Sequence, residues 1–132
     1  MPETEVRRTS VLIVDDEADF LDLLRRMLET AGYEVRCAAN AAAAITAYLD
    51  RAPDLVLTDV YMPEADGFEL INWLRSRTGA MPPVIVMSGA QTAPYNHLAV
   101  AEQLGAVAAI GKPFREAELL AAIESVLARA VP

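Results

Sequence analysis

The sequence predicts an α/β fold in which helices cover both faces of a doubly wound, five-stranded parallel β-sheet. Two observations lead to this prediction. Five short apolar runs recur along the chain, and the segments between them carry apolar residues at helical spacing. Strands that alternate with helices form right-handed βαβ units, which make the strands parallel and place helices on both faces of the sheet.

The first strand is predicted at residues 10–14 (SVLIV), and an amphipathic helix follows it. Its apolar residues repeat at the spacing of one helix face, and they are Phe20, Leu23, Leu24, Met27 and Leu28. Gly32 is a stop signal for this helix. Residues 33–38 (YEVRCA) alternate as in a half-buried strand, and Asn40 is positioned to cap the alanine-rich helix that comes next.

The third strand is predicted at residues 54–58 (DLVLT). Gly67 and Phe68 lead into a third helix, whose apolar face includes Ile71 and Leu74.

The last two strands are predicted at residues 83–87 (PVIVM) and 106–110 (AVAAI). A weaker helical pattern runs between them from about Pro94 to Leu104 and stops at Gly105. The final helix begins near Arg115. Its apolar face consists of Leu119, Leu120, Ile123, Val126 and Leu127.

The length and composition fit one folded domain. A chain of 132 residues with 54% apolar residues can bury one core and has little room for a second. We expect residues 1–9 to form an N-terminal tail and residues 10–130 to form the domain. The formal charge is −8, from 19 acidic and 11 basic residues, and this balance argues against a nucleic-acid-binding surface.

The sequence shows no sign of secretion or membrane insertion. Its single cysteine, Cys37, excludes an internal disulfide. The first ten residues contain no apolar signal-peptide core, and no apolar run reaches membrane-spanning length. We therefore expect a cytoplasmic protein that does not bind membranes.

Polar residues follow four of the five predicted strands. Asp15 and Asp16 follow the first strand, Asp59 the third and Ser88 the fourth, and Lys112 lies just after the fifth. All carboxyl ends of a parallel sheet lie together, and ligands bind there where the strand order reverses. We therefore expect these five residues to form one site.

The residue types at this expected site suit phosphoryl transfer. Three carboxylates close together repel one another, and a hard divalent cation relieves the repulsion. Mg²⁺ fits best because it combines one or two carboxylates with water and phosphate oxygens, and Mn²⁺ is an alternative ion. A carboxylate beside the ion can attack phosphorus to give an aspartyl phosphate. Lys112 would then offset the phosphoryl charge, and the Ser88 hydroxyl would donate to a phosphoryl oxygen.

Each of these residues also has an ordinary interpretation. Asp16 and Asp19 have the spacing of a helix-capping pair, and Ser88 with the glycine after it is typical of a turn. Lys112 alone would be a solvated side chain. The coincidence of complementary groups at four strand ends favours a site instead. His97, the sole histidine, is expected on the surface of the fourth helix.

Four segments of the sequence resemble the motifs of a known family. The segments VLIVDDE, PDLVLTDVYMPEADGFEL, PPVIVMSG and GKPF closely resemble response-regulator receiver domains of two-component signalling, over about Val11 to Leu127. Within that family the chain resembles the single-domain, chemotaxis-regulator-like type. The resemblance implies a flavodoxin-like (βα)5 fold with strand order 2-1-3-4-5.

The resemblance also implies roles at the acidic residues. Asp59 is the expected phosphoacceptor. The expected ligands of Mg²⁺ are Asp16, Asp59 and the backbone carbonyl of Tyr61. Asp15 is expected to contribute through a water molecule or by positioning the others.

Further roles follow from the same resemblance. Ser88 occupies the position of the family's switch serine or threonine, and Lys112 that of its lysine. The Lys112–Pro113 peptide bond is expected to be cis. The family often has an aromatic residue three positions before this lysine, where this chain has Ala109. Coupling through a rotating ring is therefore not expected here.

The implied function is reception of a phosphoryl group from a sensor histidine kinase or a histidine phosphotransfer protein. The signal would pass to a downstream protein through a changed surface around the fourth helix. Such a domain catalyses only its own phosphorylation and dephosphorylation, so we do not expect an enzyme with a separate substrate. Because the chain ends after the fifth helix, we expect a stand-alone regulator or a receiver taken from a longer protein. The alternative is a pseudo-receiver, an interaction module that works without phosphorylation.

Three other phosphate-related functions fit less well. A P-loop is excluded because five residues separate Gly105 from Gly111 and Pro113 replaces the required serine or threonine. A phosphatase of the haloacid dehalogenase type would need a second aspartate at Tyr61. A flavodoxin would need a glycine- and hydroxyl-rich loop after the first strand, where Asp15 and Asp16 would repel a flavin phosphate.

Overall fold

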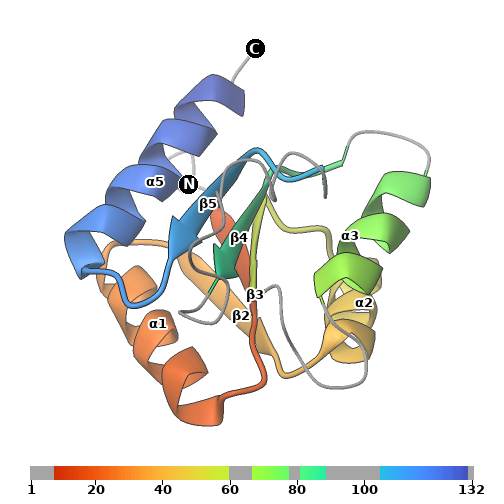
Figure 1. Cartoon of the computed structure of the whole chain (residues 1–132), viewed down its shortest axis with the longest axis horizontal. Helices are drawn as coiled ribbons and strands as arrows, with labels where there is room; N and C mark the ends of the chain where they lie inside the picture. Colours follow the sequence, from red (N-terminus) through yellow and green to blue (C-terminus); the bar gives the residue numbers. More distant parts are fainter. Residues whose placement is uncertain (1–7, 60–66, 78–80, 89–104, 131–132) are drawn as a thin grey trace, which may run out of the picture.

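The computed structural model describes residues 8–59, 67–77, 81–88 and 105–130. Five parallel strands form one sheet in the order β2-β1-β3-β4-β5, which confirms the predicted fold class and strand order (Figure 1). The strands are β1 (Ser10–Val14), β2 (Glu34–Ala38), β3 (Leu55–Asp59), β4 (Val84–Ser88) and β5 (Ala108–Gly111). The described helices are α1 (Ala18–Thr30), α2 (Ala41–Asp50), α3 (Gly67–Ser76) and α5 (Glu116–Ala130). The helix predicted from about Pro94 to Leu104, which includes His97, lies outside the described residues.

The strands start close to their predicted positions. β1 starts as predicted, β2, β3 and β4 start one residue later, and β5 starts two residues later. Tyr33 lies after α1, and its N–H donates to the carbonyl of Leu28 in the last turn of that helix (3.0 Å). Glu34 donates instead to Thr9 (2.9 Å) and starts the pairing with β1. Val107 is 46% exposed and precedes β5, whose four residues are all partly buried.

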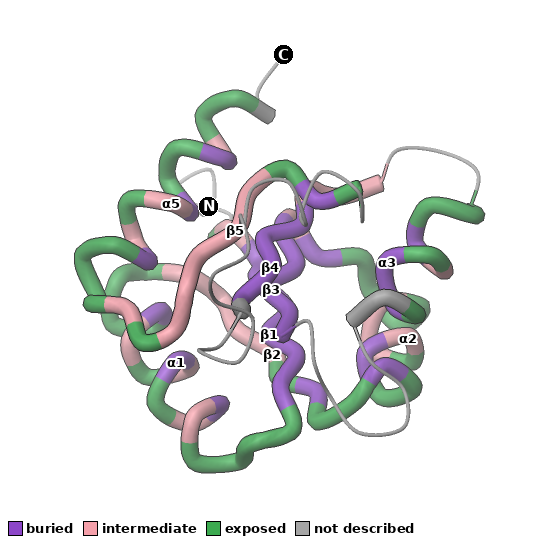
Figure 2. Tube along the Cα trace, in the orientation of Figure 1, coloured by how far each residue is buried: buried purple, intermediate pink, exposed green. Residues whose placement is uncertain are grey.

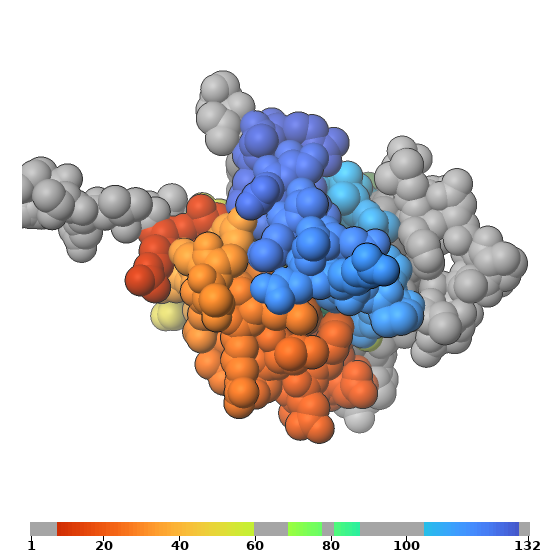
Figure 3. Space-filling view, turned by 90° about the vertical axis from the view of Figure 1, so that its left-hand side faces the viewer, coloured from red at the N-terminus to blue at the C-terminus, as the bar shows by residue number. Residues whose placement is uncertain are grey.

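Helices cover both faces of the sheet, as the alternation of strands and helices predicts. Helices α1 and α5 pack on one face, and α2 and α3 pack on the other (Figure 1). Figure 3 shows α1 and α5 side by side on the outside of the first face. Within β1, Val11 and Ile13 point to the α1–α5 side, whereas Leu12 and Val14 point to the α2–α3 side.

The two-sided cover explains the uninterrupted apolar runs in the sequence. All residues of β1 and β3 are buried, and β4 is buried from Val84 to Met87 (Figure 2). Strands covered on both faces contain few polar residues until they end. The polar residues that follow β1 and end β3 therefore mark the boundary of the core.

The predicted helix signals are present at two ends of the described helices. Asn40 caps α2, since its side-chain oxygen accepts a hydrogen bond from the N–H of Ala43 (2.8 Å). Gly32 follows α1 with a φ of 103°, and Gly105 precedes β5 with a φ of 90°. These left-handed conformations favour glycine. Among the described helices, none is long and apolar enough to cross a membrane.

Candidate functional site

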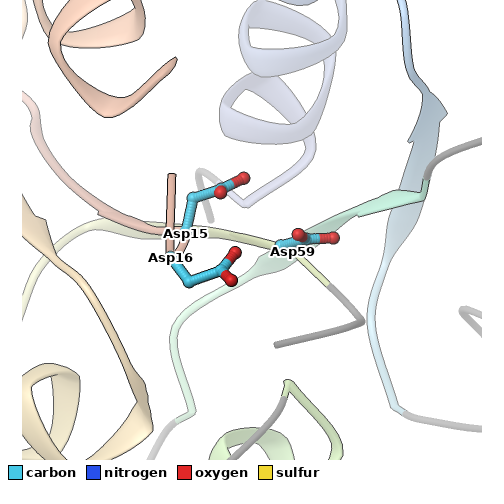
Figure 4. Close-up of side chains that lie close together, drawn as sticks. All are labelled: Asp15, Asp16 and Asp59. Atoms are coloured by element: carbon cyan, nitrogen blue, oxygen red, sulfur yellow. The ribbon is translucent and has the colours of Figure 1, made fainter. Parts of the chain in front are cut away.

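The candidate site lies at the carboxyl end of the sheet. Asp15 and Asp16 directly follow β1, Asp59 is the last residue of β3, and Lys112 directly follows β5. The strand pairing aligns these ends, since Val14 pairs with the residue before Asp59. Figure 4 shows the side chains of Asp15 and Asp16 close to that of Asp59. The order of the strands reverses at β1 and β3, where open α/β sheets bind ligands.

Asp15, Asp16 and Asp59 form an acidic cluster. Each offers one carboxylate oxygen, and these oxygens lie within 4.8 Å of one another. Asp15 is 1% exposed and Asp59 is 8% exposed, whereas Asp16 faces solvent. Oxygens on opposite sides of a bound divalent ion lie about 4 to 5 Å apart, and hard cations prefer carboxylate ligands. The cluster can therefore hold a divalent metal ion, with Asp16 on the solvent side.

Lys112 provides the positive charge of the site. Its ammonium Nζ donates to Asp15 Oδ2 at 2.8 Å and to Asp59 Oδ2 at 3.4 Å, and its side chain is 20% exposed. Burial by itself lowers the pKa of Lys112, but the hydrogen bond and charge of Asp15, with those of Asp59, outweigh burial and raise the pKa overall. Lys112 therefore stays charged at neutral pH.

Asp15 is held by both of its carboxylate oxygens. Oδ2 accepts from Lys112, and Oδ1 accepts from the backbone N–H of Glu17 at 2.9 Å. Glu17 is also the N-cap residue of α1, so Asp16 and Asp19 do not form the capping pair that their spacing allows. The sequence predicts a positioning or water-mediated role for Asp15, and the structure makes it the closer carboxylate partner of Lys112.

The ring of Phe20 contacts Lys112, and Phe114 packs against Phe20. The Nζ of Lys112 lies 4.5 Å from the centroid of the Phe20 ring, and the edge of Phe114 contacts Phe20 with centroids 5.9 Å apart. Sequence reasoning placed Phe20 only on the apolar face of the first helix and gave it no role at the site. The available signal was its position four residues, about one helical turn, after Asp16.

The other predicted site residues are placed only by their backbone or lie outside the described residues. Ser88 ends β4 and pairs with Gly111, which puts its backbone at the same end of the sheet. The Lys112–Pro113 peptide bond is cis, the isomer expected from the sequence. Ala109 pairs with Val86 and packs against the core on the α2–α3 side. Tyr61 lies outside the described residues.

Three curated relatives of this chain are named transcriptional regulatory proteins. The chain is 36% identical to the transcriptional regulatory protein GltR of Pseudomonas aeruginosa, over 92% of this chain and 50% of that protein. It is 37% identical to the phosphate regulon regulator PhoB of the same organism, over 93% of this chain and 53% of that protein. FixJ of Bradyrhizobium diazoefficiens is 36% identical, with 92% and 58% covered. The chain thus spans about half the length of these relatives.

Solved structures and a family model agree on the kind of domain. A putative response regulator from Chloroflexus aurantiacus has a TM-score of 0.84 at 28% identity, over 92% of this chain and 99% of that chain. The receiver domain of NtrX from Brucella abortus has a TM-score of 0.79 at 34% identity, over 89% and 97%. The family model described as the response regulator receiver domain matches residues 11–124. The chain therefore belongs to the response regulator receiver domain family.

Proposed function

We propose that this receiver domain accepts a phosphoryl group on Asp59 from the phosphohistidine of a sensor kinase or phosphotransfer protein, in a reaction that requires Mg²⁺. One observation carries the proposal. The Asp59 carboxylate shares a cluster with two other aspartates and lies 3.4 Å from the ammonium of Lys112. A nucleophile, a place for a divalent cation and a fixed positive charge therefore meet at one point.

The chemical step follows from these groups. An oxygen of the Asp59 carboxylate attacks phosphorus, so that a P–O bond forms and the P–N bond to the histidine breaks. The imidazole nitrogen leaves with the electron pair of that bond. Lys112 is already ordered beside Asp59 and offsets the charge of the transferred group without rearranging solvent. Asp15, Asp16 and Asp59 would hold Mg²⁺, which supplies further charge neutralisation when bound.

Phosphorylation would change the charge at Asp59, and this change would start the signal to a downstream protein. An aspartyl phosphate carries about −1.5 to −2 charges at the end of β3, as phosphorylated side chains do, in place of the single charge of the free carboxylate. In the proposed mechanism Ser88 and the segment after it move towards this charge, and the signal reaches a downstream protein through residues 88–104. Ala109 has only a methyl group and is packed on the core, so it cannot act as a rotating ring.

The domain changes only its own phosphorylation state and has no separate substrate. It works in the cytoplasm through protein partners, and its net charge of −8 disfavours direct binding to nucleic acid. A pseudo-receiver that signals without phosphorylation needs none of these site residues, and their presence together supports the phosphorylated form of signalling.

Acetyl phosphate labelling tests the proposal. Wild-type protein incubated with acetyl phosphate and Mg²⁺ should gain one phosphate by intact mass, and EDTA should prevent the gain. Asp59→Asn should not be labelled, whereas Asp50→Asn, a matched change at the exposed end of α2, should be labelled normally. Labelling of Asp59→Asn at the wild-type rate would place the phosphoryl group elsewhere. If labelling requires Asp59, phosphotransfer from a panel of histidine kinases would identify the partner kinase.

A further inference from the structure

Among the described residues, the ammonium of Lys112 contacts two carboxylates and one aromatic ring. The carboxylates belong to Asp15 (2.8 Å) and Asp59 (3.4 Å). The ring of Phe20 takes another position, with its centroid 4.5 Å from Nζ. This distance falls within the range of a cation–π contact.

The ring of Phe20 is itself fixed from two directions. Phe20 lies in the first turn of α1, the helix that follows Asp15 and Asp16. Phe114 lies two residues after Lys112 and meets the Phe20 ring edge-on, with an interplanar angle of 60°. Both rings pack against the core on the α1–α5 side of the sheet. Two residues just after β5, Lys112 and Phe114, therefore both contact the Phe20 ring.

An aromatic ring does more here than an aliphatic side chain of similar size. An aliphatic group would remove water from the ammonium and return nothing, since it has no electrostatic attraction for a cation. The face of an aromatic ring carries negative charge density and attracts the cation that it desolvates. Phe20 can therefore cover the ammonium while holding it towards the two carboxylates.

We propose that Phe20 is a positioning residue for phosphoryl transfer, which holds the Lys112 ammonium at the acidic cluster through a cation–π contact. This inference rests on the proposed function, because the ammonium that Phe20 holds is the group that offsets the phosphoryl charge. A less ordered lysine would have to be reordered during the reaction, which preorganised sites avoid.

Phosphorylation rates of four proteins test the role of the ring. At saturating Mg²⁺ and acetyl phosphate, and at a temperature where all variants are folded, Phe20→Leu should be labelled about two- to fivefold more slowly than wild type. Phe20→Tyr keeps a ring and should label at nearly the wild-type rate. Phe114→Leu removes an aromatic side chain from the same cluster but leaves the ring beside the ammonium, so its rate should fall less than that of Phe20→Leu.

A spectroscopic measurement separates this inference from the proposed function. The ring current of Phe20 should shift the ε-methylene protons of Lys112 upfield in the NMR spectrum of unphosphorylated protein. The shift should persist in Phe20→Tyr and disappear in Phe20→Leu, whether or not the protein accepts phosphate. Failure of wild type to be labelled, with this shift present, would overturn the proposed function and leave the contact established.

Three results would overturn the positioning role. The first is a wild-type spectrum without the upfield shift, because the ring would then not face the ammonium. The second is wild-type labelling by Phe20→Leu after the shift has been lost. The third is an equal loss of rate in Phe114→Leu and Phe20→Leu, which would assign the effect to packing of the aromatic cluster.

Discussion

Replacing Lys112 with methionine should destabilise the metal-free protein by about 2 to 3 kcal/mol. Removing one partner of a fully buried ion pair costs about 3–5 kcal/mol, because the other charge stays buried without compensation, whereas exposed pairs contribute about 0–1 kcal/mol. Asp15 is 1% exposed and Lys112 is 20% exposed, so the pair lies nearer the buried limit. Asp15 also keeps the hydrogen bond from Glu17, which reduces the cost.

Urea unfolding in EDTA, followed by the fluorescence of the single tryptophan, measures this free energy. The double variant Asp15→Asn, Lys112→Met should recover much of the loss, because no uncompensated charge then remains at Asp15. Arg51→Gln is the matched control. It breaks the exposed pair of Arg51 (55% exposed) with Glu34 (43% exposed), and it should lower the free energy of unfolding much less than Lys112→Met does.

A small loss of unfolding free energy in Lys112→Met would refute this reasoning. If Lys112→Met costs no more than Arg51→Gln, Asp15 is not left as an uncompensated buried charge. If the double variant is no more stable than Lys112→Met alone, the loss arises from packing of the lysine side chain and not from its charge.

Three further predictions concern the metal, a helix cap and pH. Mg²⁺ should raise the thermal unfolding midpoint of wild type, because an ion that binds the folded state stabilises it. It should raise the midpoint of Asp16→Ala much less, and equal shifts would show that Asp16 does not bind the metal. Asn40→Ala should lower the free energy of unfolding by about 1 kcal/mol in urea titrations, since Asn40 accepts from the N–H of Ala43, and Asn40→Asp should not. The hydrogen bond from Arg51, followed by its charge, lowers the pKa of Glu34. This pair therefore stabilises the fold fully above the ordinary glutamate pKa of about 4.3 and loses its effect as the pH falls through the lowered value. The stability difference between wild type and Arg51→Gln should accordingly vanish in acid, and a difference that persists there would contradict the assignment.

The sequence predicted the fold well because the pattern of each element is local. Residues 10–14 and 55–59 are buried on both sides, so their apolar runs end where the core ends. The helix stop at Gly32 and the cap at Asn40 depend only on nearby backbone groups. The boundaries of β5 were less predictable because pairing with β4, and not composition, determines where that strand begins.

The gathering of the site residues was also predictable, but their pairing was not. Parallel topology brings Asp15, Asp59 and Lys112 to one end of the sheet, and the sequence reveals that much. Which carboxylate Lys112 contacts more closely depends on side-chain directions across several strands. The role of Phe20 depends on the same geometry, and helical periodicity explains its apolar character without reference to the site.

The ion pair between Asp15 and Lys112 has a consequence for biosynthesis. The two residues are 97 positions apart, and strands β3 and β4 lie between the strands that they follow. A growing chain therefore exposes its acidic cluster before the lysine has left the ribosome, and it gains the ammonium only when β5 docks on β4. Contacts of this sequence separation form late, after the loop between them has closed. Under the proposed function, competence to receive a phosphoryl group therefore arises only at the end of folding, when β5 has docked on β4.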